Sequence, residues 1–171
     1  MVSYYYFARM LTYIYYTGSL KEFAWLMMLN KLPYTPFFNH LNGYLKAAIE
    51  KPKTYKIVSY EDMKANPQKV IKEVAEFLDI QVTPEQLEAV ASATSFEAMK
   101  ANPATNYSHW DAYGLRVKNE SQFMRKGEVG DHKNHLDAEM QGNIDDWINL
   151  HVPAFPLIQR LYSSVDTKAS E

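Results

Sequence analysis

The sequence contains no cysteine in its 171 residues. This excludes a disulfide framework and any metal site built on thiolate ligands. Positive charge is not in excess either, because 18 Lys and Arg stand against 20 Asp and Glu, for a formal net charge of −2. Nucleic-acid binding requires a strongly basic face, which this balance does not indicate. We therefore expect no nucleic-acid partner.

Long apolar runs and several common catalytic motifs are also missing. The aromatic start of the chain is interrupted by Arg9 and is too short and too hydroxylated to span a membrane. It lacks the basic region and cleavage site of a secretory signal. No GxSxG, GxxxxGK[ST], GxGxxG or HExxH pattern occurs. His132 and His135 have no third ligand beside them, so we expect no metal. Because no apolar run is long enough to span a bilayer, we also expect no membrane partner.

What the sequence does contain is an ordinary globular balance, with 47% hydrophobic and 22% charged residues. Tyrosine is frequent and crowded at the start, where the chain opens directly into an aromatic segment without a polar lead-in. This opening is typical of a sequence cut from a longer one. We expect one domain over residues 1–163 and a polar tail over residues 164–171.

Apolar residues at helical spacing predict about six helices, the first over residues 3–16. Their starts are marked by capping residues, namely the capping boxes Ser19/Glu22, Thr83/Gln86 and Thr94/Glu97 and the single caps Asn66 and Asp137. Residues 103–122 have no periodicity and are predicted to form a long surface loop.

The segment KTYKIVSYED, residues 53–62, is the one clear strand candidate, because Tyr55, Ile57, Val58 and Tyr60 are β-formers in a short run. One strand cannot make a sheet. We therefore expect its partner strands to lie outside this sequence.

The densest candidate for chemistry is the run FMRKGEVGDHK, residues 123–133. Arg125 offers a forked donor and Lys126 a point charge, and the glycines that follow let backbone N–H groups close on an oxyanion. A phosphate monoester suits such a loop. The alternative is a solvated turn in which Glu128 and Asp131 neutralise the two cations.

A second candidate is Thr94-Ser95-Phe96 at a predicted helix start. Its hydroxyls and N–H groups can face an anion or a purine edge, and Phe96 can stack on a base. The alternative is a plain helix cap, which Thr94 with Glu97 already explains.

Four segments, in order, resemble the cytosolic sulfotransferase family. RKGEVGDHKNH resembles the family signature RKGxxGDWKNH, TSFEAMKANPATNY resembles TSFxxMKxNPxxNY, and YEDMKANPQKVIKEVAEFLDI resembles the YEDMKxxP segment with its helix. VSYYYFARM resembles the end of the family's 3′-phosphate-binding segment. The resemblance runs from Ser3 to about Ile148.

The resemblance implies an α/β, P-loop-NTPase-like fold, here an N-terminally truncated and mostly helical portion with one clear strand. It implies a cytoplasmic enzyme that transfers a sulfuryl group from 3′-phosphoadenosine 5′-phosphosulfate (PAPS) to a hydroxyl or amine of a small acceptor. The product nucleotide is 3′-phosphoadenosine 5′-phosphate (PAP), and no metal is implied.

The resemblance also implies roles for particular residues. Ser3 matches a serine that binds the 3′-phosphate, and Tyr60 matches a tyrosine at the adenine. Phe96 stacks on the base, within a segment whose matched residues are Thr94, Ser95, Phe96 and Met99. The 3′-phosphate loop is matched by Phe123, Met124, Arg125, Lys126 and Gly127. Residues 103–122 fall where the family has a mobile lid.

The sequence also departs from the family. No PKSGTTW-like loop for the 5′-phosphosulfate, no general-base histidine and no arginine upstream of Ser3 can be matched. No catalytic residue is therefore predicted. His132 replaces the signature tryptophan. The dimer motif KxxxTVxxxE falls on residues 133–142 with Asp137-Ala138 for Thr-Val and Gly142 for Glu, so that dimer is not expected.

Three hypotheses follow. The chain is part of an active sulfotransferase, a catalytically inactive module that binds PAPS or PAP, or a helical interaction domain whose motifs are relics. The acceptor stays open among phenols, sterols and other small alcohols or amines.

Overall fold

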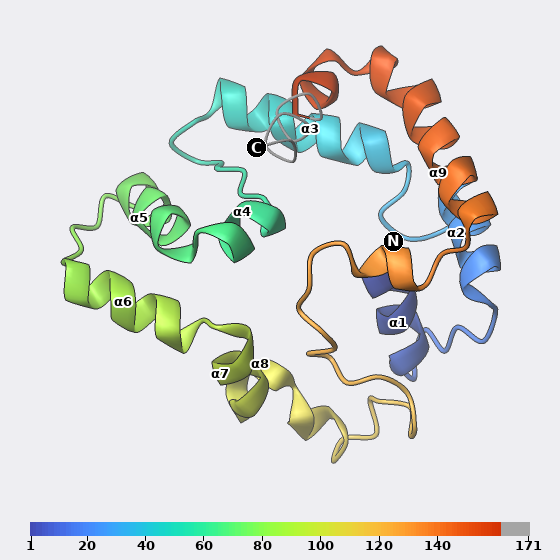
Figure 1. The fold of residues 1–171 in the computed structure, drawn as a ribbon, viewed down its shortest axis with the longest axis horizontal. Coiled ribbons are helices and arrows are strands. Elements are labelled where there is room, and N and C mark those ends of the chain that lie inside the picture. Colours follow the sequence, from blue (N-terminus) through green and yellow to red (C-terminus); the bar gives the residue numbers. More distant parts are fainter. Residues whose placement is uncertain (162–171) are drawn as a thin grey trace. The chain divides into compact units, whose positions relative to one another are not determined.

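The computed structural model describes residues 1–161, which fold almost entirely as helices (Figure 1). Within this range there are nine α-helices and three short 3₁₀-helices. The α-helices are α1 (Val2–Met10), α2 (Leu20–Met28), α3 (Phe37–Glu50), α4 (Tyr60–Ala65), α5 (Pro67–Phe77), α6 (Pro84–Ala93), α7 (Phe96–Ala101), α8 (Pro103–Asn106) and α9 (Ala138–His151). The 3₁₀-helices are η1 (Ser108–Trp110), η2 (Asp131–Asn134) and η3 (Val152–Ala154). The mostly helical character predicted from the sequence is confirmed.

The chain divides into two compact units. The first unit combines Met1–Gly18 with Val58–His132 and contains α1 and α4 to α8. Within the described residues, the second combines Ser19–Ile57 with residues 133–161 and contains α2, α3 and α9. The predicted domain bounds, 1–163 and 164–171, stay predictions, and the tail lies outside the described residues.

Most of the predicted helix caps are confirmed. Ser19 and Glu22 form a reciprocal capping box at α2, and Thr83 and Gln86 form another at α6. Single caps close the N-termini of α5 and α9, where Asn66 accepts a hydrogen bond from the Lys69 N–H and Asp137 accepts one from the Met140 N–H. These short-range interactions are local in the chain, which is why the sequence alone predicts them.

Removing the N-terminal cap of α6 should lower the stability of the fold moderately. We expect Thr83→Ala to lower the free energy of unfolding by about 1 kcal/mol, because the Gln86 N–H loses its hydroxyl acceptor. Urea denaturation followed by circular dichroism measures this. The control is Thr17→Ala, which removes an exposed threonine from the same unit outside any helix. Equal effects of the two changes would contradict the cap's contribution.

The third predicted capping box, Thr94 with Glu97, is wrong. Thr94 instead ends α6, where its hydroxyl donates a 2.7 Å hydrogen bond to the Val90 carbonyl. Ser95 caps α7, and its hydroxyl accepts from the Ala98 N–H at 3.2 Å. Two adjacent hydroxyl residues can each serve as a cap, and here α6 uses the first for its own C-terminus.

The predicted strand over residues 53–62 is also wrong. The chain turns at Lys51–Thr54, continues without regular structure, and enters α4 at Tyr60. Ser59 caps that helix by accepting from the Asp62 N–H at 3.0 Å. A strand needs a neighbour to receive its backbone hydrogen bonds, and within residues 1–161 the β pairing is limited to an isolated bridge elsewhere.

That bridge explains why the first helix is shorter than predicted. α1 ends at Met10, where Leu11 becomes extended and pairs antiparallel with Arg116. The Thr12 N–H donates to the Leu115 carbonyl at 3.0 Å, and the Val117 N–H donates to the Met10 carbonyl at 2.8 Å. These long-range hydrogen bonds compete with continuation of the helix to residue 16, and they tie α1 to the segment that precedes the cationic loop.

The predicted loop over residues 103–122 is irregular only in part. It begins with α8 and η1, and Tyr107 between them adopts the left-handed conformation with φ of 55°. Asn102 caps α8 by accepting from the Ala104 N–H at 3.0 Å. These elements are too short to produce a periodic pattern in the sequence. The predicted long surface loop therefore contains two short helical elements at its start.

Candidate nucleotide site

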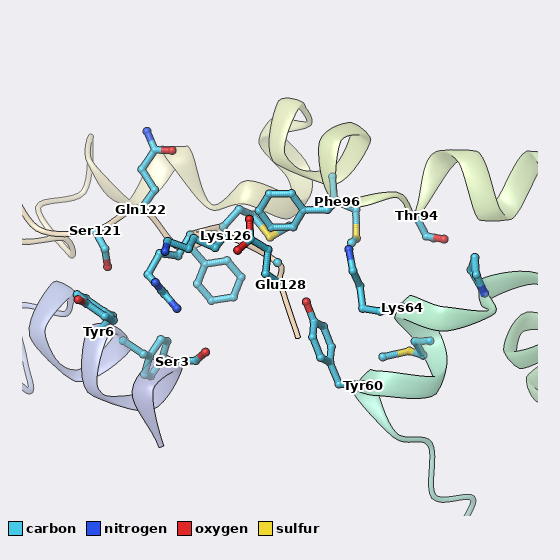
Figure 2. Close-up of a pocket in the computed structure, with 18 of the residues that line it drawn as sticks. Ser3, Tyr6, Tyr60, Lys64, Thr94, Phe96, Ser121, Gln122, Lys126 and Glu128 are labelled. Carbon is cyan, nitrogen blue, oxygen red and sulfur yellow. The ribbon is translucent and has the colours of Figure 1, made fainter. Parts of the chain in front are cut away.

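The first unit contains a cavity of about 950 Å³, shown in Figure 2. Its walls come from α1, from α4 to α7 and from residues 121–128. Ser3 and Tyr6 come from α1, and Tyr60 and Lys64 come from α4 across the cavity, where the Lys64 side chain extends toward Phe96. Elements distant in the sequence therefore meet around one space, and most of the surface lining it is apolar.

Ten of the eleven nucleotide-site residues predicted from the sequence line this cavity. They are Ser3, Tyr60, Thr94, Phe96, Met99, Phe123, Met124, Arg125, Lys126 and Gly127. Ser95 does not line it and instead caps α7, the helix that carries Phe96 and Met99. The structure thus brings the predicted set together, while the nucleotide role of each residue stays a prediction.

The two cations of the predicted phosphate loop converge on one carboxylate. Arg125 donates from Nη2 to Oδ2 of Asp131 at 2.6 Å, and Lys126 donates from Nζ to Oδ1 at 2.7 Å. The Asp131 side chain is 5% exposed. The Arg125 guanidinium carbon also lies 4.6 Å from the centre of the Tyr6 ring, a cation–π contact. Arg125 is therefore held from two sides.

Gly127 lies directly against the aromatic ring of Phe96. Its φ is +68°, and a Cβ built at this position would lie 2.2 Å from Phe96 Cδ2 and 2.5 Å from Cε2. A side chain there would have to displace the Phe96 ring, and the left-handed backbone also favours glycine. The glycine thus lets the loop that carries the cations approach the predicted base platform closely.

Two further cations approach the same ring. Lys64 Nζ lies 5.8 Å and Lys100 Nζ 5.6 Å from the centre of Phe96. Lys64 also lines the cavity. The ring of Phe96 is therefore surrounded by the Gly127 backbone and by two ammonium groups.

Tyr60 and Ser3 occupy helix starts on opposite sides of the cavity. Tyr60 is the first residue of α4, and not the end of a strand as predicted. Desolvation by partial burial raises the pKa of the Tyr60 phenol, and the nearby charge of Glu61 adds to this. The phenol stays protonated at neutral pH and can both donate and accept. Ser3 lies in the first turn of α1, where backbone N–H groups point out of the helix.

The segment leading into the cationic loop is fastened to α1. Arg9 donates from Nε to Oε2 of Glu120 at 3.0 Å and from Nη2 to Oε1 at 2.5 Å. These hydrogen bonds, followed by one to the Tyr5 hydroxyl, raise the pKa of Arg9 above its ordinary value. A forked pair of this kind fixes both position and orientation.

Aromatic contacts make a second attachment around Phe123. Its ring lies 4.6 Å from Tyr107, 5.7 Å from Trp110 and 6.3 Å from Phe7 of α1, each in an edge-to-face arrangement. Edge-to-face pairs at these distances are favourable. Phe123 thus packs between α1 and residues 107–110, and the lid role predicted for residues 103–122 stays a prediction.

Sequence reasoning missed three contributors to the site: Tyr6, Lys64 and the structural position of Asp131. Asp131 was considered only as a neutralising charge in a turn, although its spacing of five and six residues from the cations leaves room for a closed loop. Tyr6 and Lys64 carry no local signal, because their contacts with Arg125 and Phe96 are long-range in the chain.

Two negative findings concern residues 1–161 alone. No group of three or more His, Cys, Asp or Glu side chains is gathered there in a way that could hold a metal ion. None of the helices in this range has the length and apolar character needed to cross a bilayer.

Comparison with known proteins identifies the family. The profile described as "Sulfotransferase domain" matches residues 1–162. The chain belongs to the sulfotransferase family. Mouse "Sulfotransferase 1B1" is 37% identical over 144 residues, which are 84% of this chain and 47% of that protein. This sulfotransferase chain therefore spans about half the length of the curated relatives it matches.

Solved structures of similar fold include two that bear on this sulfotransferase chain. One is retinol dehydratase in complex with androsterone and inactive cofactor PAP, with a TM-score of 0.80 and 26% identity, covering 86% of this chain and 42% of that one. The other is mouse sulfotransferase SULT7A1 complexed with PAP, with a TM-score of 0.77 and 22% identity, covering 97% and 58%. The second likeness concerns the fold alone.

Proposed function

We propose that this chain binds the 3′-phosphate and adenine of PAPS or PAP. The observation that carries the proposal is the position of Gly127. This residue directly follows Arg125 and Lys126 in the chain and lies against the ring of Phe96. In 3′-phosphoadenosine the base and the 3′-phosphate are attached to the same ribose, so a binding site must hold an aromatic platform and an anion clasp close together. Arg125 and Lys126 supply the clasp, and Phe96 supplies the platform.

The remaining predicted residues support the same ligand. Tyr60 offers a protonated phenol to the adenine edge, and Met99 and Thr94 extend the wall around it. On the other side of the cavity, Ser3 and the N–H groups of the first turn of α1 suit the phosphate. Phe123 and Met124, which precede the two cations in the chain, also line the cavity.

For the whole protein we propose sulfuryl transfer from PAPS to a hydroxyl or amine of a small acceptor. The basis is membership of the sulfotransferase family together with the retinol dehydratase structure, which contains PAP and a steroid. In-line transfer needs a base on the acceptor and cations on the leaving phosphate. Because no matched residue here supplies that base, we assign this chain the nucleotide side of the site. The P-loop-like sheet of the complete fold and a cytosolic location are proposed on the same resemblance.

A second candidate function is an inactive module that binds PAPS or PAP. It is favoured by the lack of any match to the phosphosulfate loop or the general-base histidine within these residues. A radiolabelled transfer assay from PAPS to a phenol and to a steroid alcohol tests this second candidate, because sulfated product from the purified 171-residue chain would reject the inactive module.

Binding itself is tested by isothermal titration calorimetry of the 171-residue chain with PAP, with adenosine 5′-monophosphate as the matched ligand that lacks the 3′-phosphate. We expect PAP to bind at least about 10-fold more tightly, since charge-assisted hydrogen bonds contribute about 1.5–3 kcal/mol each. Absence of heat from a chain that is helical by circular dichroism would reject the proposed function. Equal affinities would reject the assignment of the 3′-phosphate to this loop.

A further inference from the structure

Asp131 is the one buried charged or polar residue among residues 1–161, with 6% of its surface exposed. It lies at the start of η2, just after the glycine-containing loop. Both of its carboxylate oxygens face the cavity loop, because each accepts a hydrogen bond from one of the two cations, Arg125 and Lys126. No residue of the proposed phosphate clasp is as deeply buried as this carboxylate.

Burial of a carboxylate is unfavourable unless charged donors compensate for the lost hydration. Here two charge-assisted hydrogen bonds of 2.6 and 2.7 Å do so. Counting Arg125 and Lys126 as +1 each and Asp131 as −1, the three groups keep a net charge of +1. The carboxylate therefore lowers the positive charge of the clasp without removing its attraction for an anion.

The geometry also restricts the two long side chains. Free Arg and Lys side chains each have many rotamers, and binding a phosphate with them costs the entropy of ordering them. Asp131 holds the Arg125 guanidinium at one edge while the Tyr6 ring lies 4.6 Å from its central carbon. Lys126, whose side chain is 40% exposed, is held at its ammonium group by the same carboxylate.

A guanidinium carries five N–H donors and an ammonium three. Asp131 accepts a hydrogen bond from Arg125 Nη2 and another from Lys126 Nζ. A carboxylate that orients a cation in this way, without meeting the ligand, acts as the outer-shell partners of metal-binding residues do.

We propose that Asp131 is a positioning residue, which orients Arg125 and Lys126 before the 3′-phosphate arrives. The inference rests on the proposed nucleotide-binding function. It assigns to Asp131 no contact with the nucleotide. Changing Asp131 should therefore lower the affinity only for ligands that carry the phosphate bound by the two cations. A residue that only stabilises the fold would affect all nucleotides alike.

The test is Asp131→Asn, which keeps the shape of the side chain but loses its charge and one acceptor. Affinities of the 171-residue chain for PAP and for adenosine 5′-monophosphate are measured by calorimetry at the same salt concentration. We expect PAP affinity to fall about 10–100-fold, the range seen for outer-shell partners, while monophosphate affinity changes less than about 3-fold. The ratio of the two affinities should therefore fall.

The matched control is Asp111→Asn. Asp111 also accepts two hydrogen bonds from an arginine, Arg116, at 2.6 Å each, but it lies outside the large cavity and its side chain is 51% exposed. This change removes the same charge from the same unit. The affinity ratio should stay at its wild-type value in the control.

The outcomes are distinguishable. If the wild-type chain binds no PAP, the proposed function fails and this inference fails with it. If the wild-type chain prefers PAP and a folded Asp131→Asn variant keeps the same ratio, only the inference is overturned. Should Asp131→Asn fail to fold by circular dichroism, Asp131→Glu takes its place, because it keeps the charge but displaces the carboxylate. A lowered ratio in Asp131→Glu supports positioning, and an unchanged ratio overturns it.

Discussion

Replacing both Arg125 and Lys126 by alanine is expected to reduce the affinity for PAP by about 10²–10⁴-fold. The 3′-phosphate loses two charged donors, each contributing about 1.5–3 kcal/mol. The two side chains line the same cavity and are 18% and 40% exposed, so solvent screens them only in part. Calorimetric titration of the double variant with PAP measures the loss.

The double change also leaves Asp131 buried without these two donors, which lowers stability. A second variant, Arg125→Gln with Lys126→Gln, keeps neutral N–H donors at both positions and still lacks both charges. A matched control, Arg160→Ala with Lys118→Ala, removes the same charge from exposed positions outside the cavity. Wild-type PAP affinity in a folded Gln variant would show that this loop is not the phosphate site.

Replacing Gly127 by alanine is expected to lower the free energy of unfolding by about 2–5 kcal/mol in total. One part, about 1–2 kcal/mol, comes from placing a side chain at a φ of +68°. The other, about 1–3 kcal/mol, comes from the new Cβ, which would lie 2.2 Å from Phe96 Cδ2 and must displace the ring. Because Phe96 is the proposed base platform, PAP affinity should fall as well.

Gly114 provides the matched control for this change. Its φ is +64°, and nothing lies within 4 Å of a Cβ built on it. Gly114→Ala therefore carries the backbone strain without the clash, and urea denaturation of both variants isolates the contribution of Phe96. If Gly127→Ala is no more destabilising than Gly114→Ala, then the loop does not pack against the ring as described.

Both predictions concern the loop formed by Arg125, Lys126 and Gly127, of which the sequence shows the residues but not the contacts. The run of Arg125, Lys126 and Gly127 is readable as an anion loop, because cations beside a glycine have a recognisable chemistry. The role of Gly127 against Phe96 is not readable, since 31 positions separate the two residues. The alternative was a solvated turn in which Glu128 and Asp131 neutralise the two cations. Asp131 does pair with both cations, but it is buried and not solvated.

Errors in the predicted fold have a common cause. Tyr55, Ile57 and Val58 favour a strand locally, yet β-structure depends on a partner that this stretch does not have among residues 1–161. The helix predicted to residue 16 ends at Met10, because Leu11 pairs with Arg116 more than 100 positions later. The predicted strand does not form because it has no pairing partner among these residues. The predicted helix is cut short because a distant residue pairs with Leu11.

The sequence by itself determined the family, the starts of α2, α5, α6 and α9, and ten of the residues that line the cavity. Capping hydroxyls, short cationic motifs and helical spacing each involve only a few neighbouring residues, so they can be recognised in the sequence. Only the tertiary structure decided that Arg125 and Lys126 share Asp131, that Tyr6 flanks the guanidinium, and that Gly127 touches Phe96. These contacts depend on how the chain folds back on itself, and packing in three dimensions sets them.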